Sequence, residues 1–336
     1  LAQLENGQYC STHGSGMSAV TAVAHLFKQG EHVIISKDCY GGVFRLFNDV
    51  IRHFGVEVSF VDLKNLDRVR DVLQSNTKCI WAESPTNPLL RLVDIKALSM
   101  IANESDAFLV LDNTFCSPIL QKPLDLGAHI VVHSLSKYIN GHCDVLGGAV
   151  ITNDKDVANR IHFLTNAMGI GSPAFDSWLI LRGIKTLNIR YRHQEKTAMF
   201  VAKTLAKHPL ISRVIYPGLK SHPDYDLAKR QQNGFGSVIC IELSGGLDAA
   251  KILAEGTKLC TLAVSLGGVS TLIEVPAFHS HASMTKAARV EAGISNGLIR
   301  LSIGLEEPED IVNDLIQGLE LIKNKKDKQK IMRSVK

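Results

Sequence analysis

The sequence lacks the features that mark several large classes of protein. No apolar run reaches the roughly 18 residues that a membrane-spanning helix needs, and we expect no secretory signal. None of the seven cysteines forms a CxxC pair. This argues against a disulfide framework and a zinc site, and we expect a reducing, cytoplasmic setting. Internal repeats are absent, as is a GxGxxG loop of the dinucleotide-binding kind.

Outside its C-terminal tail, the chain carries no net positive charge. The formal net charge is +4, but Lys323–Lys336 carries seven Lys or Arg and one Asp, which leaves a balance near −2 for the rest. A nucleic-acid partner requires a basic face that this balance does not provide. We therefore expect no nucleic acid and no membrane as partner, and we expect the basic tail to be a frayed, solvated end.

The length of 336 residues and the hydrophobic content of 45% fit two globular domains. Short apolar runs alternate with amphipathic stretches up to about Thr152, which predicts an α/β domain with a mostly parallel sheet. The predicted strands are 32–36, 57–61, 79–84, 107–113, 129–134 and 148–152, with helices over 43–53, 65–74 and 94–103. A long helical pattern follows over 173–207. We place the boundary at Gly183, giving a large domain 1–183 and a smaller C-terminal α/β domain 184–336 with a basic tail.

Polar side chains end three of the predicted strands: Glu83, Asp112 and Ser134. Ligands of parallel sheets bind beyond these carboxyl ends. Lys137 follows Ser134 by three residues and is bracketed by hydroxyls, so it is either a solvated loop lysine or a nucleophilic, Schiff-base-forming lysine beside a phosphate site. A charge at Asp112 needs a partner, which could be a helix N-terminus, an arginine or a protonated ring nitrogen.

Other patterns add weaker signals. Ser11–Met17 is a glycine-rich turn before a helical run, which suits a phosphate through its free backbone N–H groups, although no strand is predicted ahead of it. Tyr40 follows a strand and is either packed or catalytic. Arg300 lies in an apolar strand and needs an anion, for which a carboxylate is well shaped. The pair His279 and His281 has no further ligand at suitable spacing, so no metal site is predicted.

In this order, these pieces resemble the cysteine/methionine-metabolism group of fold-type I enzymes that use pyridoxal 5′-phosphate (PLP). That group includes cystathionine β- and γ-lyases, cystathionine γ-synthase and methionine γ-lyase. The resemblance runs from Leu1 to about Lys323. It is carried by Asp38–Gly42, Glu83–Pro88, Asp112–Phe115, Ser134–His142, Pro173–Trp178, Arg182–Thr186, Ser265–Gly268 and Ile299–Gly304. It implies the fold-type I PLP-dependent transferase fold.

The resemblance also implies roles at the cofactor. Lys137 would hold PLP covalently and later move protons, while Asp112 would keep the pyridine nitrogen protonated so that the ring accepts electrons. Tyr40 would stack on the ring and act as an acid or base. The implied cofactor-binding residues are Gly16, Met17, Tyr40, Asp112, Thr114, Ser134, Ser136 and Lys137. The implied catalytic residues are Lys137, Tyr40 and Asp112.

At the substrate, the resemblance implies that Arg300 clamps the α-carboxylate with help from Ser265, and that Asn87 bonds the substrate or the ring oxygen. Fixing the substrate in this way supplies a large share of such catalysis. Val264 stands where γ-synthases and γ-lyases of the group have Glu. The implied substrate is a small amino acid.

Two sequence features favour a β-lyase, and two others favour a γ-synthase. Val264 removes the distal carboxylate, and Gly42 stands where methionine γ-lyases have Cys, so both favour cystathionine β-lyase. Asp38–Phe44 and Asn87–Asp94 are closer to γ-synthase. We expect a cystathionine β-lyase, with cystathionine γ-synthase, or cystathionine or methionine γ-lyase, as the alternative. The group's upstream Tyr-x-Arg element is absent, so we expect residues before Leu1, an active site shared between subunits and a homotetramer.

Overall fold

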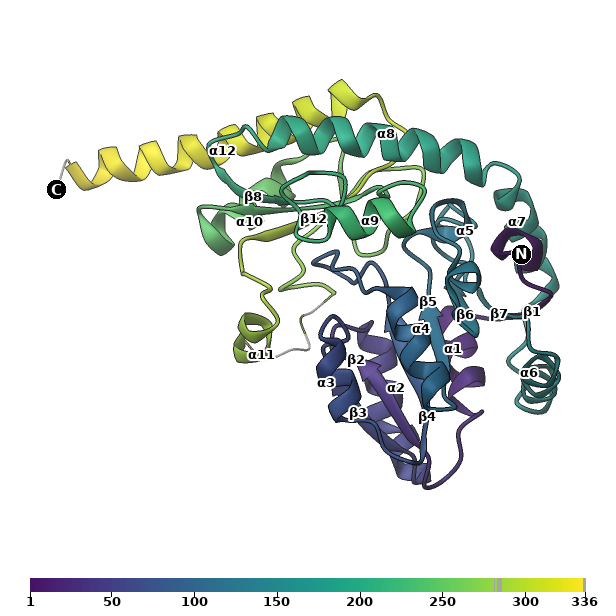
Figure 1. The fold of residues 1–336 in the computed structure, drawn as a ribbon. Helices are drawn as coiled ribbons and strands as arrows, with labels where there is room; N and C mark the ends of the chain where they lie inside the picture. Colours follow the sequence, from purple (N-terminus) through teal and green to yellow (C-terminus); the bar gives the residue numbers. More distant parts are fainter. Residues whose placement is uncertain (281, 283–285, 335–336) are drawn as a thin grey trace. The chain divides into compact units, whose positions relative to one another are not determined.

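The computed structural model describes residues 1–280, 282 and 286–334, and it divides into two compact units (Figure 1). The first unit comprises Leu1–Asn188 and Asp224–Phe235, and the second comprises Ile189–Pro223 and Gly236–Lys336. The boundary therefore follows Asn188 instead of Gly183, and a short later segment returns to the first unit.

A seven-stranded sheet forms the centre of the first unit, in the order β1-β7-β6-β5-β4-β2-β3. Its strands are β1 (Tyr9–His13), β2 (His32–Ser36), β3 (Glu57–Val61), β4 (Thr77–Glu83), β5 (Phe108–Asp112), β6 (Ile130–Ser134) and β7 (Gly148–Thr152). Strands β2 to β6 pair in parallel, whereas at one edge β7 pairs antiparallel with β6, and β1 pairs antiparallel with β7. The prediction of a mostly parallel α/β sheet is confirmed.

Helices cover both faces of this sheet, which explains why its strands are apolar on both sides. Residues of α1 (Gly16–Ala24), α2 (Gly41–Asp49) and α6 (Lys155–Ala167) share one core with the sheet. Residues of α3 (Leu66–Asp71) and α4 (Ile95–Glu104) share the core of the other face. The remaining elements of the unit are η1 (Ala2–Glu5), η2 (Ile51–Phe54), α5 (Ser117–Leu120), η3 (Pro123–Leu126), α7 (Ala174–Ile184) and α9 (Tyr225–Gln231).

The long helical pattern over 173–207 is two helices, α7 and then α8 (Leu187–Leu205). Gly183 lies against the backbone of Asn140, so closely that a Cβ there would collide with the Asn140 carbonyl oxygen. At the break, the Thr186 hydroxyl donates to the Gly183 carbonyl oxygen at 3.2 Å. Close packing therefore explains the glycine, and the apolar pattern alone could not reveal the break.

The second unit has a five-stranded sheet in the order β10-β11-β12-β9-β8. Its strands are β8 (Ile211–Ile215), β9 (Val238–Leu243), β10 (Thr261–Leu262), β11 (Leu272–Glu274) and β12 (Leu298–Ser302), and its helices besides α8 are α10 (Gly246–Gly256), α11 (Lys286–Glu291) and α12 (Pro308–Ser334). Helix α12 continues to Ser334, so the tail expected to be frayed is helical over its described part.

Candidate active site

Three neighbouring parallel strands end in the polar residues expected to mark the site. Glu83 ends β4, Asp112 ends β5 and Ser134 ends β6. Glu83 and Asp112 are partners in the register of β4 and β5. Because parallel strands present their carboxyl ends at the same edge, these side chains belong to one region of the sheet.

Asp112 is held by the turn that follows it. Its Oδ1 accepts a hydrogen bond from the Thr114 backbone N–H at 2.9 Å, and Thr114 Oγ1 in turn accepts from the Ser134 N–H at 2.8 Å. Burial raises the pKa of Asp112, against the hydrogen bonds from Thr114 and the charge of His133, which lower it. A cation next to this carboxylate would stabilise its charged form.

The glycine-rich turn brings the start of α1 onto Ser134. A Cβ on Gly16 would lie 3.0 Å from Ser134 Cβ and 3.2 Å from its Oγ, so the glycine allows this close approach without displacing Ser134. The Ser15 side chain caps the helix by accepting from the Ser18 N–H at 3.0 Å. The first N–H groups of a helix have no partner within it, so they can bind an anion beside Ser134.

A strand does precede this turn, contrary to the sequence prediction. It is β1, which pairs antiparallel with β7 at the edge of the sheet. Its sequence, YCSTH, is short and largely polar, so it carries no apolar signal. Because β1 pairs with an antiparallel neighbour and no GxGxxG loop follows it, a dinucleotide-binding unit is still excluded.

Lys137 lies in the turn directly after β6 and is half-buried. Its N–H donates to the Ser134 carbonyl oxygen at 3.3 Å, and its own carbonyl oxygen accepts from the Gly141 N–H at 2.7 Å. Ser136 Oγ accepts from the Gly147 N–H at 3.1 Å. The turn is thus fixed to the end of β6 and to the chain entering β7.

Tyr40 is placed at the start of α2, with half of its surface exposed. A Cβ on Gly42 would lie 2.5 Å from Tyr40 Cε1 and 2.6 Å from Met17 Sδ. Gly42 therefore leaves the space in which the Tyr40 ring approaches the first turn of α1. The backbone N–H groups of Tyr40 and Asn87 donate to Oε2 and Oε1 of Glu83, at 2.8 and 3.2 Å.

The substrate-binding candidates of the second unit form a separate group. Arg300 on β12 donates to the Ser265 carbonyl oxygen at 2.5 Å, and its Nη1 lies 3.1 Å from Glu274 Oε1. Both charged side chains are buried. Val264, the residue before Ser265, is 55% exposed.

Sequence reasoning missed Glu274. It lies in a short apolar strand opposite Arg300. The rule that drew attention to Arg300, a charge within an apolar run, would also have selected Glu274, but the pairing of β11 with β12 is not readable from the sequence.

The first unit fits the PLP implied by the resemblance. The glycine at position 16 leaves a cradle for a phosphate between helix N–H groups and the Ser134 hydroxyl. The carboxylate of Asp112 would gain from a protonated ring nitrogen as its cation. The half-exposed Tyr40 ring, near Met17, offers an aromatic face for stacking.

Two further findings concern metals and membranes. Within the described ranges, no three His, Cys, Asp or Glu side chains cluster as metal ligands would; His281 lies outside those ranges. No helix in the described part of the chain combines the length and the apolar character that a bilayer crossing requires.

Comparison with known proteins identifies the family. The family model described as Cys/Met metabolism PLP-dependent enzyme matches residues 1–320. The chain is 47% identical to an L-methionine gamma-lyase of Fusobacterium nucleatum subsp. polymorphum, covering 96% of this chain and 82% of the relative. It is 45% identical to a cystathionine beta-lyase of Coxiella burnetii, covering 95% and 83%.

A solved structure agrees in fold. The structure of cystathionine gamma synthase from Xanthomonas oryzae pv. oryzae matches with a TM-score of 0.93 and 43% identity, covering 95% of this chain and 83% of that one. With a family model over nearly the whole chain and relatives of this identity, the chain belongs to the Cys/Met metabolism PLP-dependent enzymes, and its cofactor is pyridoxal 5′-phosphate.

Proposed function

We propose that this enzyme is a cystathionine β-lyase. It converts cystathionine and water into homocysteine, pyruvate and ammonia. The Cα–H and Cβ–S bonds break, the sulfur leaves with the bonding electron pair and gains a proton, and water hydrolyses the three-carbon remainder. When bound, PLP serves as the electron sink that makes the Cα proton acidic.

The chain's own residues bind, orient and move protons. Lys137 would hold the cofactor, and its Nζ would take the Cα proton. Asp112 would supply the carboxylate for the ring nitrogen. Tyr40 would offer its ring for stacking, and its hydroxyl would exchange a proton with the substrate or the leaving sulfur. Arg300, with Ser265, binds the α-carboxylate, and Asn87 contributes a further hydrogen bond. The phosphate is held by Gly16, Met17, Thr114, Ser134 and Ser136.

Val264 is the observation that carries the choice of β-elimination. It is an exposed, apolar side chain next to Ser265, whose carbonyl oxygen receives a hydrogen bond from Arg300. A glutamate at this position would bring a negative charge to the distal part of the substrate. The apolar residue removes that charge, which supports β-elimination over the γ-reactions.

The test is to incubate the purified, PLP-loaded protein with cystathionine and identify the keto acid. Pyruvate with homocysteine is expected. 2-Oxobutyrate with cysteine would contradict the proposal and favour γ-elimination. Formation of cystathionine from cysteine and an O-acylhomoserine, with no keto acid from cystathionine, would instead indicate a γ-synthase.

We further propose that the enzyme is a cytoplasmic homotetramer, a dimer of dimers with shared active sites. All seven cysteines are free, which fits a reducing compartment. Large apolar side chains are exposed along α7: Phe175 at 67%, Trp178 at 51% and Leu181 at 61%. An exposed apolar stripe of this kind supports burial against another chain.

A further inference from the structure

The buried carboxylate of Glu83 has no part in the chemistry proposed above. It is only 5% exposed, and it is the register partner of Asp112 on the neighbouring strand. A buried carboxylate is costly unless hydrogen bonds or cations compensate it. Its partners therefore indicate what it does.

Each oxygen of Glu83 binds a different loop. Oε2 accepts the Tyr40 N–H at 2.8 Å, and Oε1 accepts the Asn87 N–H at 3.2 Å. Tyr40 is the residue before α2, and its side chain does not cap that helix. The Glu83 carboxylate thus holds the backbone of both residues. It thereby fixes the points from which the Tyr40 and Asn87 side chains extend.

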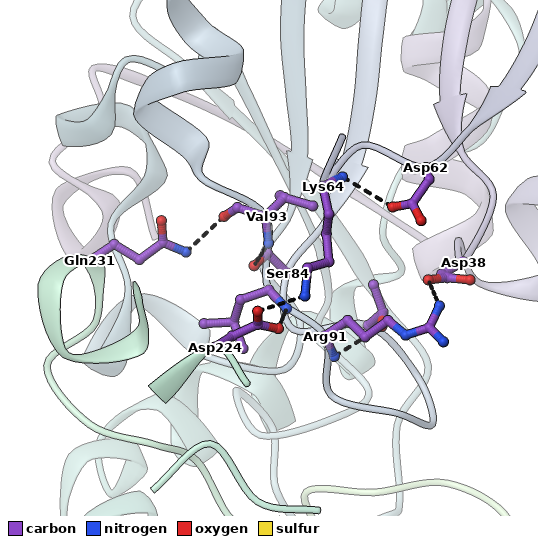
Figure 2. Close-up of polar contacts among 10 residues, drawn as sticks. Asp38, Asp62, Lys64, Ser84, Arg91, Val93, Asp224 and Gln231 are labelled. Atoms are coloured by element: carbon purple, nitrogen blue, oxygen red, sulfur yellow. Dashed lines mark hydrogen bonds and ion pairs between the residues drawn. The ribbon is translucent and has the colours of Figure 1, made fainter. Parts of the chain in front are cut away.

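The same two loops are joined a second time, farther out. Arg91 pairs with Asp38 (Figure 2), and its Nη1 lies 2.8 Å from Asp38 Oδ2. Asp224 holds the loop of Arg91 from the other side, because it accepts the Leu92 N–H at 3.0 Å and the Lys64 ammonium at 2.6 Å. The Arg91–Asp38 pair is partly exposed, so it contributes less than the buried carboxylate.

The hydrogen bonds that Glu83 accepts oppose the cost of burying its charge. Burial and the neighbouring Asp112 carboxylate raise the pKa of Glu83 well above its usual range, whereas the N–H groups of Tyr40 and Asn87 lower it. These two N–H groups therefore stabilise the charged form of the side chain in this setting.

We propose that Glu83 is a positioning residue that sets Tyr40 and Asn87 relative to each other through its two carboxylate oxygens. The inference rests on the proposed function for the roles of Tyr40 and Asn87 at the cofactor and substrate. Glu83 acts on the reaction by fixing where these two side chains start.

Two variants of the PLP-loaded protein separate positioning from simple stability. Glu83→Ala removes both acceptors. Glu83→Gln has nearly the same shape but only one acceptor oxygen for the two N–H donors, so it retains one bond at most. The matched control is Asp314→Asn. Asp314 is also a buried carboxylate, and it accepts the backbone N–H groups of Lys258, Leu259 and Cys260 in the second unit.

Three measurements follow: amide hydrogen exchange of peptides containing Tyr40 and Asn87, circular dichroism of the bound cofactor's visible band, and kcat and KM for cystathionine. Both Glu83 variants are expected to keep the cofactor covalently bound. Exchange at one or both N–H groups should be at least about tenfold faster, the cofactor band should change, and kcat should fall about 10- to 100-fold. Asp314→Asn should alter stability while leaving all three readouts near wild type.

Folded Glu83 variants with unchanged exchange at both N–H groups, or with an unchanged cofactor band and kcat, would overturn the proposal. If Glu83→Ala does not fold, Glu83→Gln decides alone. Exchange and circular dichroism need no substrate. They therefore still decide the role of Glu83 if the wild-type protein releases no keto acid from cystathionine, a result that would count against the proposed function only.

Discussion

At the scale of single residues, buried charges with specified partners occur in both groups of proposed site residues. Asp112 accepts a hydrogen bond from the Thr114 N–H, and Arg300 forms an ion pair with Glu274 across β12 and β11. Removing one partner of a buried ion pair is far more costly than changing an exposed one. These positions therefore tolerate substitution poorly, whereas Val264 is exposed and is the residue that we propose selects the reaction.

Asp112 and Arg300 could be predicted from the sequence because a charge inside an apolar run requires a partner. Their partners could not. Glu274 meets Arg300 only because β11 and β12 pair, and Glu83 binds Tyr40 only because β4 places it beside the start of α2. Sequence spacing carries no information about contacts of that kind.

Val264→Glu is expected to shift the products from pyruvate toward 2-oxobutyrate, because it restores a negative charge beside Ser265. A change of about tenfold in the product ratio corresponds to a difference of about 1.4 kcal/mol between the two barriers. The ratio is measured by keto-acid analysis with cystathionine as substrate. Leu262→Glu adds the same charge at another exposed residue and should leave the ratio unchanged. An unchanged ratio in Val264→Glu would refute the specificity argument.

At the scale of elements, the central parallel strands β2, β4, β5 and β6 were predictable because they are largely buried and are rich in apolar residues. Strand β1 was not, since YCSTH lacks that pattern and is held by pairing with β7. Strands β10 and β11 are too short for any periodicity. A strand that is held mainly by pairing with a neighbouring strand cannot be recognised from its own sequence pattern.

Strand β1 ends in a histidine that should make the fold sensitive to acid. His13 is fully buried, neither ring nitrogen has a hydrogen-bond partner among the described residues, and burial lowers its pKa from 6.5 to about 4. The unfolded chain binds this proton first, so the stabilisation is complete above about pH 6.5 and is lost as the pH falls toward 4. The loss amounts to about 3 kcal/mol.

His13→Leu should remove that part of the pH dependence. Urea unfolding at pH 7 and pH 4.5 measures it: the difference in unfolding free energy between the two pH values should be smaller in the variant by about 2 kcal/mol. Replacing the exposed His53 by leucine is the control and should preserve the wild-type difference. Equal pH dependence in His13→Leu and wild type would show that His13 is already protonated or accessible in the fold.

At the scale of the whole molecule, we proposed that the chain forms a homotetramer. The exposed apolar side chains on α7 lie at spacings of three residues, so they share roughly one side of the helix. Leu181→Asp places a charge within this stripe and should yield a smaller species in sedimentation velocity. Met100→Asp changes a similarly exposed apolar residue on α4 and should keep the wild-type species. A wild-type protein that sediments as a monomer would refute the proposal.

The central claim is that Lys137 holds the cofactor. The direct test is to reduce the purified holoprotein with borohydride, digest it and locate the modified lysine by mass spectrometry, with Lys137→Ala in parallel. The account predicts one pyridoxyl-phosphate group on Lys137, and in the variant neither this adduct nor the visible absorption of the bound cofactor. A reducible adduct on another lysine, or one that survives in Lys137→Ala, would contradict it.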